Sequence, residues 1–417
     1  MAFPVRLLKV CLCQKAEAFL NEESKKVPLK NDLRDVAVVG AGIGGLAVAA
    51  AFLRRGVRVT VFEQSQELGE VGAGVMLTPN ASRCLADFGI LDEVAAEAIT
   101  PEWTRVRDGH TGEIVSEAPV GNAYTARFGV PFLCIHRADL HGALLRLVTR
   151  LDPQCVRVGY RLTRATEQSG SVALNFENGS EHIVDAAVGC DGIRSVVREQ
   201  LGLHDAARFT GNVAWRGLVP AEKLGLVDPP NTMTIWASPT AHITEYSIRG
   251  GRLRNFVASA ERSGWEIESW RVQVPSMEAL AEFSDWHPAV RELIGNTPEG
   301  GCFKWALFDR DPIERAAQGR IALLGDAAHP MLPFMAQGAA MAIEDAIVLS
   351  RCWSAATNVE EAFTRYNAAR MPRTAWAQLR SRHAQHIYRG NRGKDIDADR
   401  EDRMVRLYGY DALTAEI

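Results

Sequence analysis

The chain of 417 residues is long enough for two or three domains, or for one large α/β enzyme with a second lobe. Hydrophobic residues make up 47% of it and charged residues 24%, a globular composition that excludes a disordered or fibrous protein. The formal net charge of -4 gives no general attraction to nucleic acid or to anionic lipid, so neither is an expected partner.

The cysteines and the N-terminal segment indicate a protein of the reducing cytoplasm. None of the eight cysteines forms the C-x-x-C pair of a zinc or redox site, so free thiols and no bound metal are expected. Residues 1–34 contain no clean apolar region followed by a small-residue cleavage site, which argues against secretion. These residues also lack an apolar period that joins them to the segment from Val36 onward, and we interpret them as an extension.

The first regular elements form a β-α-β unit. Val36–Val39 is an apolar run typical of a buried parallel strand, Leu46–Arg55 has helical character, and Val57–Phe62 is rich in β-branched residues. The uncharged run Val36–Leu53 is long enough to raise the question of a membrane span. Its cluster of glycines predicts a turn instead.

That turn carries a dinucleotide fingerprint. Gly40, Gly42 and Gly45 fit G-x-G-x-x-G between the strand and the helix, where a backbone without a Cβ approaches a pyrophosphate and the helix N-terminus attracts it. Glu63, at the end of the second strand, is placed to accept hydrogen bonds from a ribose diol. The fingerprint alone does not distinguish FAD from NAD, and a tight turn without a ligand is its simplest alternative.

Later segments add two further strands with functional turns, a sheet and three helices. Strands are expected at Ala186–Cys190, before Asp191-Gly192, and at Arg320–Leu324, before Gly325-Asp326. Short alternating stretches between about 206 and 308 predict an antiparallel sheet. The expected helices are Met277–Ile294, Ala339–Trp353 and Val359–Arg370.

Four motifs resemble those of a known family. They are the H-R-x-D-L stretch at His136–His141, the D-G stretch at Gly189–Ser195, the G-D stretch at Gly325–Pro330 and the small-residue run Gln337–Ala346. With them the chain resembles the FAD-dependent aromatic hydroxylases, single-component flavoprotein monooxygenases that use NADH or NADPH, from about Val36 to the C-terminus. The salicylate hydroxylases, 3-hydroxybenzoate 6-hydroxylases and 6-hydroxynicotinate 3-monooxygenases are the most similar members. The closing Tyr408–Ala412 supports this group.

The resemblance implies roles for five more residues. Arg137 is expected to lie against the FAD, Asp191 to touch it, and Asp326 to bind its ribityl chain. The helix that begins at Gly338 and Ala339 is expected to direct its N-terminus at the pyrimidine edge of the flavin, where it stabilises the anionic reduced form. By themselves, Arg137 could be a helix-cap ion pair and Asp191 part of an ordinary turn.

The implied fold is α/β: a discontinuous Rossmann-like FAD-binding domain with an inserted antiparallel-sheet substrate domain and C-terminal helices. The expected FAD-binding segments are 35–101, 136–205 and 309–358, the substrate-domain segments are 102–135 and 206–308, and the helical region is 359–417. The resemblance leaves open whether the chain forms a homodimer.

His242 and Tyr246 are the expected catalytic residues. Their even spacing on a strand points both side chains to one face, and they match the His and Tyr that serve the two hydroxylase groups acting on 3-hydroxybenzoate and 6-hydroxynicotinate. Histidine suits the deprotonation of a phenol near neutral pH, although a strand histidine without a catalytic role is the alternative. Arg216 and Arg249 are equal candidates for holding a substrate carboxylate.

The pocket residues favour a benzene ring. Met76 and Phe334 stand where the hydroxynicotinate enzymes have histidines, and Pro333 stands where the 3-hydroxybenzoate enzymes have glutamine. An apolar floor of Met76, Phe334 and Trp236 suits salicylate or another hydroxybenzoate, with molecular oxygen as co-substrate. The alternatives are a pyridine hydroxylase like the 6-hydroxynicotinate enzymes, an epoxidase or polyketide hydroxylase on the same fold, and a flavin-binding regulatory protein without turnover.

Overall fold

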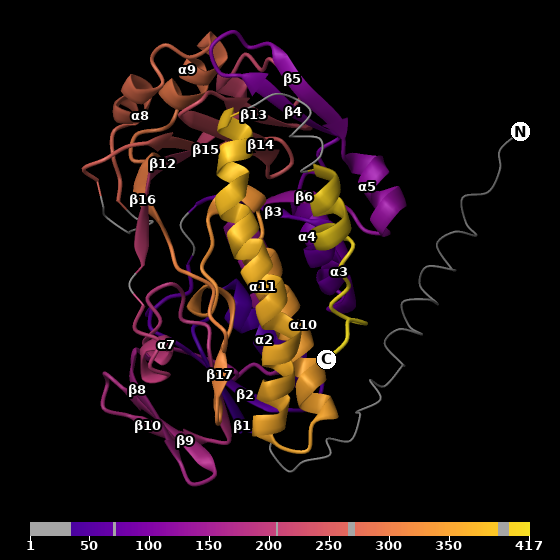
Figure 1. Cartoon of the computed structure of the whole chain (residues 1–417), viewed down its shortest axis with the longest axis vertical. Helices are drawn as coiled ribbons and strands as arrows, with labels where there is room; N and C mark the ends of the chain where they lie inside the picture. Colours follow the sequence, from indigo (N-terminus) through magenta and orange to yellow (C-terminus); the bar gives the residue numbers. More distant parts are fainter. Residues whose placement is uncertain (1–34, 70–71, 206, 266–271, 391–399) are drawn as a thin grey trace, which may run out of the picture.

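The computed structural model describes residues 35–69, 72–205, 207–265, 272–390 and 400–417, with the backbone alone for 385–390. The extension predicted at residues 1–34 lies outside the described residues. The described chain has a mixed α/β fold. A parallel sheet and its helices lie at one end, and a larger, mostly antiparallel sheet lies at the other (Figure 1).

The parallel sheet is built around β1 (Asp35–Val39), which pairs with β2 on one side and β11 on the other. Residues 36–39 are each at most 4% exposed, as expected for a strand covered on both faces. The order across the sheet is β17 (Ala317–Gln318), β18 (Ile321–Leu323), β11 (Ala186–Gly189), β1, β2 (Arg58–Glu63) and β7 (Val156–Val158), with β17 antiparallel to β18.

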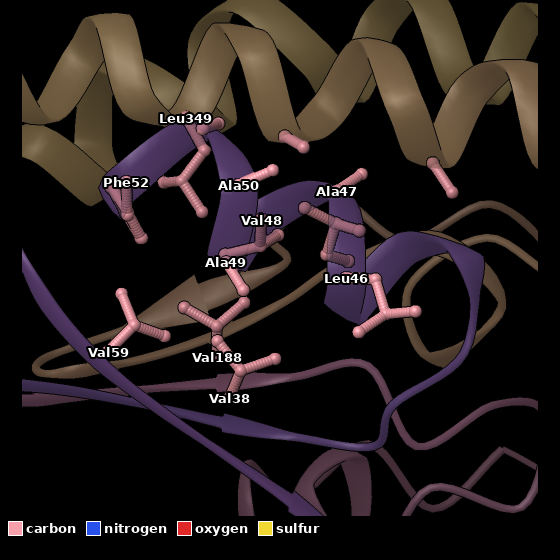
Figure 2. Close-up of a cluster of buried hydrophobic side chains, with 14 of the residues drawn as sticks. Val38, Leu46, Ala47, Val48, Ala49, Ala50, Phe52, Val59, Val188 and Leu349 are labelled. Carbon is pink, nitrogen blue, oxygen red and sulfur yellow. The ribbon is translucent and has the colours of Figure 1, made fainter. Parts of the chain in front are cut away.

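Helix α2 (Ile43–Leu53) covers one face of this sheet. Figure 2 shows Val38, Val59 and Val188 of three neighbouring strands on one side of α2 and Leu349 of α10 on the other. The alanines at 47 and 49–51 are fully buried, and their small side chains allow α10 (Gly338–Ala355) to pack close to α2. The glycine-rich turn before α2 is therefore held between rigid elements.

The opposite face is covered by a small antiparallel sheet of β8 (Leu162–Gln168), β9 (Ser171–Phe176) and β10 (Glu181–Val184). The rings of Phe62 on β2 and Phe176 on β9 lie 4.6 Å apart and join the two sheets.

The second large sheet has seven strands. In spatial order they are β16 (Phe303–Asp309), β12 (Arg208–Pro220), β15 (Leu253–Glu261), β14 (Ala241–Ile248), β13 (Thr232–Ala237), β4 (Trp103–Asp108) and β5 (Ile114–Pro119). Neighbours are antiparallel except β13 and β4, which are parallel. The segments 102–135 and 206–308 thus contribute to one sheet. The division into domains stays a prediction.

The two faces of the seven-stranded sheet have different neighbours. One face, which includes Trp215 and Phe256, packs against α8 (Ser276–Glu282) and α9 (Pro288–Gly295). The other, which includes Ala214 and Tyr246, forms a cluster with Phe334 of η3 (Pro333–Met335) and with Met76. Met76 belongs to β3 (Gly74–Leu77), which pairs with β6 (Leu133–His136). This second face is therefore turned toward β3 and η3.

Further helices connect these layers. They are α3 (Pro79–Asp87), α4 (Leu91–Glu97), α5 (Gly121–Phe128), α6 (Arg137–Leu151), α7 (Val196–Gln200), α11 (Val359–Gly390), the short η1 (Ala221–Lys223) and η2 (Gly325–Ala327), and the π-helical η4 (Met404–Tyr408). Within the described part of the chain, no helix combines the length and the apolar character that a membrane span requires.

Two helix predictions were wrong in their extent. The predicted helix Met277–Ile294 is two helices, because Pro288 starts a new one and the ring of His287 accepts a hydrogen bond from the amide of Ala289. The predicted helix that ends at Arg370 continues to Gly390 through Pro372. Contacts beyond the proline hold it: Gln378 donates to Pro330 O and Ser381 donates to Leu332 O.

Candidate active site

A side chain at each of the three fingerprint glycines would meet different surroundings. Gly40 has φ +101°, and a Cβ there would lie 2.5 Å from Cys190 O. A Cβ at Gly45 would overlap the carbonyl oxygen of Gly40, so this glycine allows α2 to pack on the strand. A Cβ at Gly42 would meet nothing within 4 Å. The open space at Gly42, at the N-terminus of α2, fits the pyrophosphate of a dinucleotide.

Glu63 lies beside this turn. Its carboxylate accepts hydrogen bonds from the amides of Ala41 and Ser65, each at 2.8 Å. The carbonyl group of Ala41 is held by His141, whose Nε2 lies 2.7 Å from Ala41 O. His141 ends the H-R-x-D-L stretch, but the sequence predicted no role for it. Glu63 and His141 together fix the turn, and the ribose contact of Glu63 stays a prediction.

Asp191 is engaged with α7. Its carboxylate accepts from Ser195 Oγ at 2.5 Å and from the amides of Val196 and Val197 at 2.8 and 3.2 Å. Burial raises the pKa of Asp191, and these hydrogen bonds oppose the rise. The carboxylate thus caps a helix, and the predicted contact with FAD is untested.

Arg137, Asp326, Gly338 and Ala339 lie together where η2, α6 and α10 begin. Surrounding protein raises the pKa of Asp326, while His329 and Arg137 act to lower it. Asp326 nevertheless remains exposed, so its carboxylate lies in a recess open to solvent. A Cβ at Gly338 would be 4.0 Å from Asp326 Oδ1.

The N-terminus of α10 is positively polarised by the helix dipole. The 18-residue helix has no acidic residue in its first turn and no side-chain cap. A ribityl hydroxyl at Asp326 and an anionic ring edge at the start of α10 match these properties. Together with the open space at Gly42, they fit FAD.

A buried ionic network behind this recess was not predicted from the sequence. Asp345 on α10 accepts from Arg370 Nε at 2.6 Å, lies 2.6 Å from His329 Nε2 and accepts from the amide of Gly325 at 3.2 Å. Its neighbour Glu344 pairs with Arg370 at 2.8 Å. The acidic pair inside an apolar helix was the available signal, but the arginine partner lies on α11.

His242 and Tyr246 share a face of β14, as predicted. Both are at most 5% exposed. The ring of His242 lies 5.0 Å from that of Phe334, and burial raises the pKa of Tyr246 well above its usual range. Tyr246 therefore stays protonated near neutral pH and is available as a hydrogen-bond donor. The catalytic roles of both residues are not tested by the fold.

Arg216 and Arg249 have different surroundings. Arg249 forms a two-pronged ion pair with Asp139, with both distances 3.0 Å. Arg216 is 5% exposed, and its guanidinium lies 5.1 Å from the ring centre of Phe303. Burial and the charge of Arg137 lower the pKa of Arg216 to about 10, which leaves it positive at neutral pH. Arg216 is thus a buried cation on the face that carries His242.

Of the three residues predicted for the pocket floor, two lie near Tyr246 and the third lies on the other face of the sheet. Met76 and Phe334 contact the cluster that contains Tyr246. Trp236 lies on the opposite face, where it stacks on His287 at 5.3 Å and its Nε1 donates to Glu245 at 2.7 Å. Trp236 pairs with Ile243, one residue after His242, so the strand register turns it away from the pocket.

Comparison with known proteins agrees with this geometry. Residues 34–381 match a family model described as an FAD binding domain. A 3-amino-4-hydroxybenzoate 2-monooxygenase of Streptomyces platensis is 39% identical over 390 residues, which cover 90% of this chain and 96% of that protein. A 3-hydroxybenzoate 6-hydroxylase of Polaromonas naphthalenivorans is 38% identical, covering 85% of this chain and 88% of that protein.

A solved salicylate hydroxylase substrate complex is similar in structure, with a TM-score of 0.77 and 28% identity over 91% of this chain and 96% of that one. Because the family match and the relatives span most of the chain, the protein is an enzyme and not a flavin-binding regulator without turnover. The chain belongs to the FAD-dependent aromatic monooxygenases, which bind FAD and ordinarily use NADH or NADPH as reductant.

Proposed function

We propose that this enzyme hydroxylates a small benzoic acid that carries a ring hydroxyl group, such as salicylate or another hydroxybenzoate. The observation that carries the proposal is the position of Arg216 and His242 on one face of the sheet. Arg216 lies opposite Val257, which lies opposite Thr244, two residues after His242 and on the same face of β14. Two strand spacings, about 10 Å, therefore separate Arg216 from the catalytic strand. The guanidinium lies against the rings of Phe303 and Trp305 on β16, and in this proposal the substrate lies over the sheet between the guanidinium and His242.

The chemistry of the face suits such a substrate. The guanidinium of Arg216 binds the carboxylate, and Met76 and Phe334 provide apolar contact for the ring. His242 accepts the proton of the ring hydroxyl, which makes the ring more electron-rich, and the protonated Tyr246 donates a hydrogen bond to the resulting oxygen. Bound FAD, reduced by NADH or NADPH, supplies the activation of molecular oxygen.

The flavin-binding residues have separate roles in this proposal. Gly42 and the N-terminus of α2 bind the pyrophosphate, Glu63 the ribose and Asp326 the ribityl chain. The start of α10 at Gly338 and Ala339 stabilises negative charge on the ring edge. Arg137 and the backbone at Asp191 complete the contacts.

The test is a panel of aromatic acids offered to the purified, FAD-loaded enzyme. It contains salicylate, 3-hydroxybenzoate, 4-hydroxybenzoate, 3-amino-4-hydroxybenzoate and 6-hydroxynicotinate, each with NADH and with NADPH. We expect a hydroxybenzoate, with or without the amino group, to stimulate cofactor oxidation and to yield a hydroxylated product. Stimulation by 6-hydroxynicotinate alone would contradict the benzene-ring assignment.

We also propose a cytoplasmic location. The six cysteines in the described residues are all free, as expected in a reducing compartment. A homodimer stays a prediction, and light scattering on the purified protein tests it.

A further inference from the structure

One hydrogen bond ties β3 to β15, the strand that lies beside β14 with His242 and Tyr246. The amide of Gly74 on β3 donates to Asn255 Oδ1 on β15 at 2.7 Å. Asn255 lies directly opposite Tyr246 in the pairing of β15 with β14, so the two side chains share the pocket face. Both are buried, with 1% and 4% of their surface exposed. None of the catalytic or flavin-binding roles proposed for this enzyme involves Asn255.

The side chains around Gly74 leave no room for a Cβ atom. A Cβ there would lie 2.7 Å from Asn255 Cγ and 2.7 Å from both Cε2 and the hydroxyl oxygen of Tyr246. No real side chain tolerates contacts this short, and the φ of Gly74 is not in the left-handed region. The backbone of β3 therefore rests directly on the ring of Tyr246.

The side-chain amide of Asn255 uses its oxygen to accept the hydrogen bond from Gly74. Its oxygen must face Gly74 because the backbone amide is a donor. Among the described residues, its Nδ2 has no hydrogen-bond partner. A buried amide that bonds on one side only is uncommon in a purely structural position. The hydrogen bond to Gly74 is thus the polar contact that this side chain makes within the described structure.

The residue before Gly74 is hydrogen-bonded to Arg137, a predicted FAD-binding residue. Ala73 O accepts a hydrogen bond from the amide of Arg137 at 2.8 Å. One short segment at the start of β3 is therefore bonded on one side to the first residue of α6 and on the other side to Asn255. The same segment thus contacts Arg137 through Ala73, and Asn255 and Tyr246 through Gly74.

We propose that Asn255 is a positioning residue for hydroxylation: through Gly74 it sets the placement of Tyr246 and the pocket face relative to the flavin. The inference rests on the proposed function of the same site. A displacement of about 1 Å between reacting groups can reduce a rate about a hundred-fold. Asn255 thus acts on the fraction of reduced cofactor that leads to product, and not on FAD binding.

The experiment compares Asn255→Ala, Asn255→Asp and Gly74→Ala with the wild type, all FAD-loaded. Asn255→Ala removes the acceptor and Gly74→Ala forces the strand away from Tyr246. We expect both to lower product formation about a hundred-fold, with smaller changes in KM and in the rate of cofactor oxidation, and with release of hydrogen peroxide. Asn255→Asp keeps an oxygen at the acceptor position, so it should retain more product per cofactor than Asn255→Ala.

Gly69→Ala is the matched control, because a Cβ at Gly69 meets nothing within 4 Å and its φ is not left-handed. It should behave as wild type. The proposal is overturned if Asn255→Ala reduces product only in proportion to lost FAD. It is also overturned if Asn255→Asp and Asn255→Ala form the same amount of product per cofactor consumed. Should Asn255→Ala fail to fold, the comparison of Gly74→Ala with Gly69→Ala decides alone.

A measurement without substrate separates this inference from the proposed function. Hydrogen exchange of the Gly74 amide in the FAD-loaded protein should be slow in the wild type and fast in Asn255→Ala. Failure of every hydroxybenzoate in the panel would contradict the proposed function while leaving this result intact. Equal exchange rates in the two proteins would contradict the role of the hydrogen bond between Gly74 and Asn255.

Discussion

At the scale of single residues, the proposed base is the most direct test of the chemistry. His242→Ala should still bind FAD and still be reduced by NAD(P)H, because neither step requires the proton of the substrate hydroxyl. Hydroxylation should fall roughly a hundred-fold to ten-thousand-fold, as for other lost general bases. The measurement is the ratio of product formed to cofactor consumed, at matched substrate saturation, with peroxide determined in parallel. An unchanged ratio would show that His242 is not the base.

Arg216 and Arg249 permit a paired comparison of two arginines. Arg216→Met should raise the substrate KM roughly ten- to hundred-fold, since a hydrogen bond to a charged group contributes about 1.5–3 kcal/mol. Arg249→Met is the matched control, because Arg249 is bound to Asp139 and its side chain is 38% exposed. Its KM should stay close to that of the wild type. Equal effects of the two substitutions would show that Arg216 is not the carboxylate anchor.

At the scale of elements, the network between α10 and α11 should govern acid stability. The charges of His329 and Arg370 outweigh burial and lower the pKa of Asp345 to about 2, from an ordinary 3.8. A carboxyl whose folded pKa is depressed stabilises the protein above its unfolded pKa, and this contribution disappears as the pH falls from about 4 to about 2. The acid unfolding of the wild type should therefore steepen in this window.

Asp345→Asn should remove that pH dependence and destabilise the protein by about 3–5 kcal/mol at neutral pH, as expected when one partner of a buried ion pair is lost. Urea unfolding at several pH values measures both effects. Glu361→Gln is the control: its pKa is also lowered to about 2, but by Thr357 and Arg365 at the surface of α11. A similar loss of stability in both variants would contradict a special role for the buried network.

The elements also show which predictions the sequence could support. The turn that contains Gly40, Gly42 and Gly45 could be predicted because the spacing of the glycines reflects local backbone geometry. The carbonyl of Cys190, which also excludes a side chain at Gly40, could not. The position of Trp236 could not, because it depends on the register between β13 and β14, and a shift by one residue moves a side chain to the other face. The partnership of Asn255 with Gly74 joins residues 181 positions apart, and only the docking of two lobes creates it.

The length of α11 illustrates the same limit. Proline inside a helix removes a hydrogen bond and is a reasonable signal for its end. Here, contacts beyond Pro372 with β16 and with the loop that precedes η3 compensate for the lost bond. Tertiary packing of this kind overrides local propensity, and no local pattern in the sequence reports it.

At the scale of the whole molecule, α11 connects the nucleotide-binding end to the seven-stranded sheet (Figure 1). Near the N-terminus of α11, the hydroxyl of Tyr366 donates to Leu323 O of β18 at 3.2 Å. Farther along, Arg382 donates to Asp309 of β16 at 2.5 Å, to Arg310 O at 2.6 Å and to Asp311 at 2.8 Å. The helix thus makes side-chain hydrogen bonds to both the parallel sheet and the seven-stranded sheet.

Arg382→Met should weaken this connection without touching the site. We expect FAD content to remain, the free energy of unfolding to fall by about 1.5–3 kcal/mol, and the ratio of product to consumed cofactor to drop, because the link between the two sheets is weaker. Arg365→Met is the control, since Arg365 pairs with Glu361 one turn away on the same helix and contributes no link between the layers. Calorimetry gives the stability and product analysis gives the ratio. If the two variants form product with equal efficiency, α11 stabilises the fold but does not set the distance across the active site.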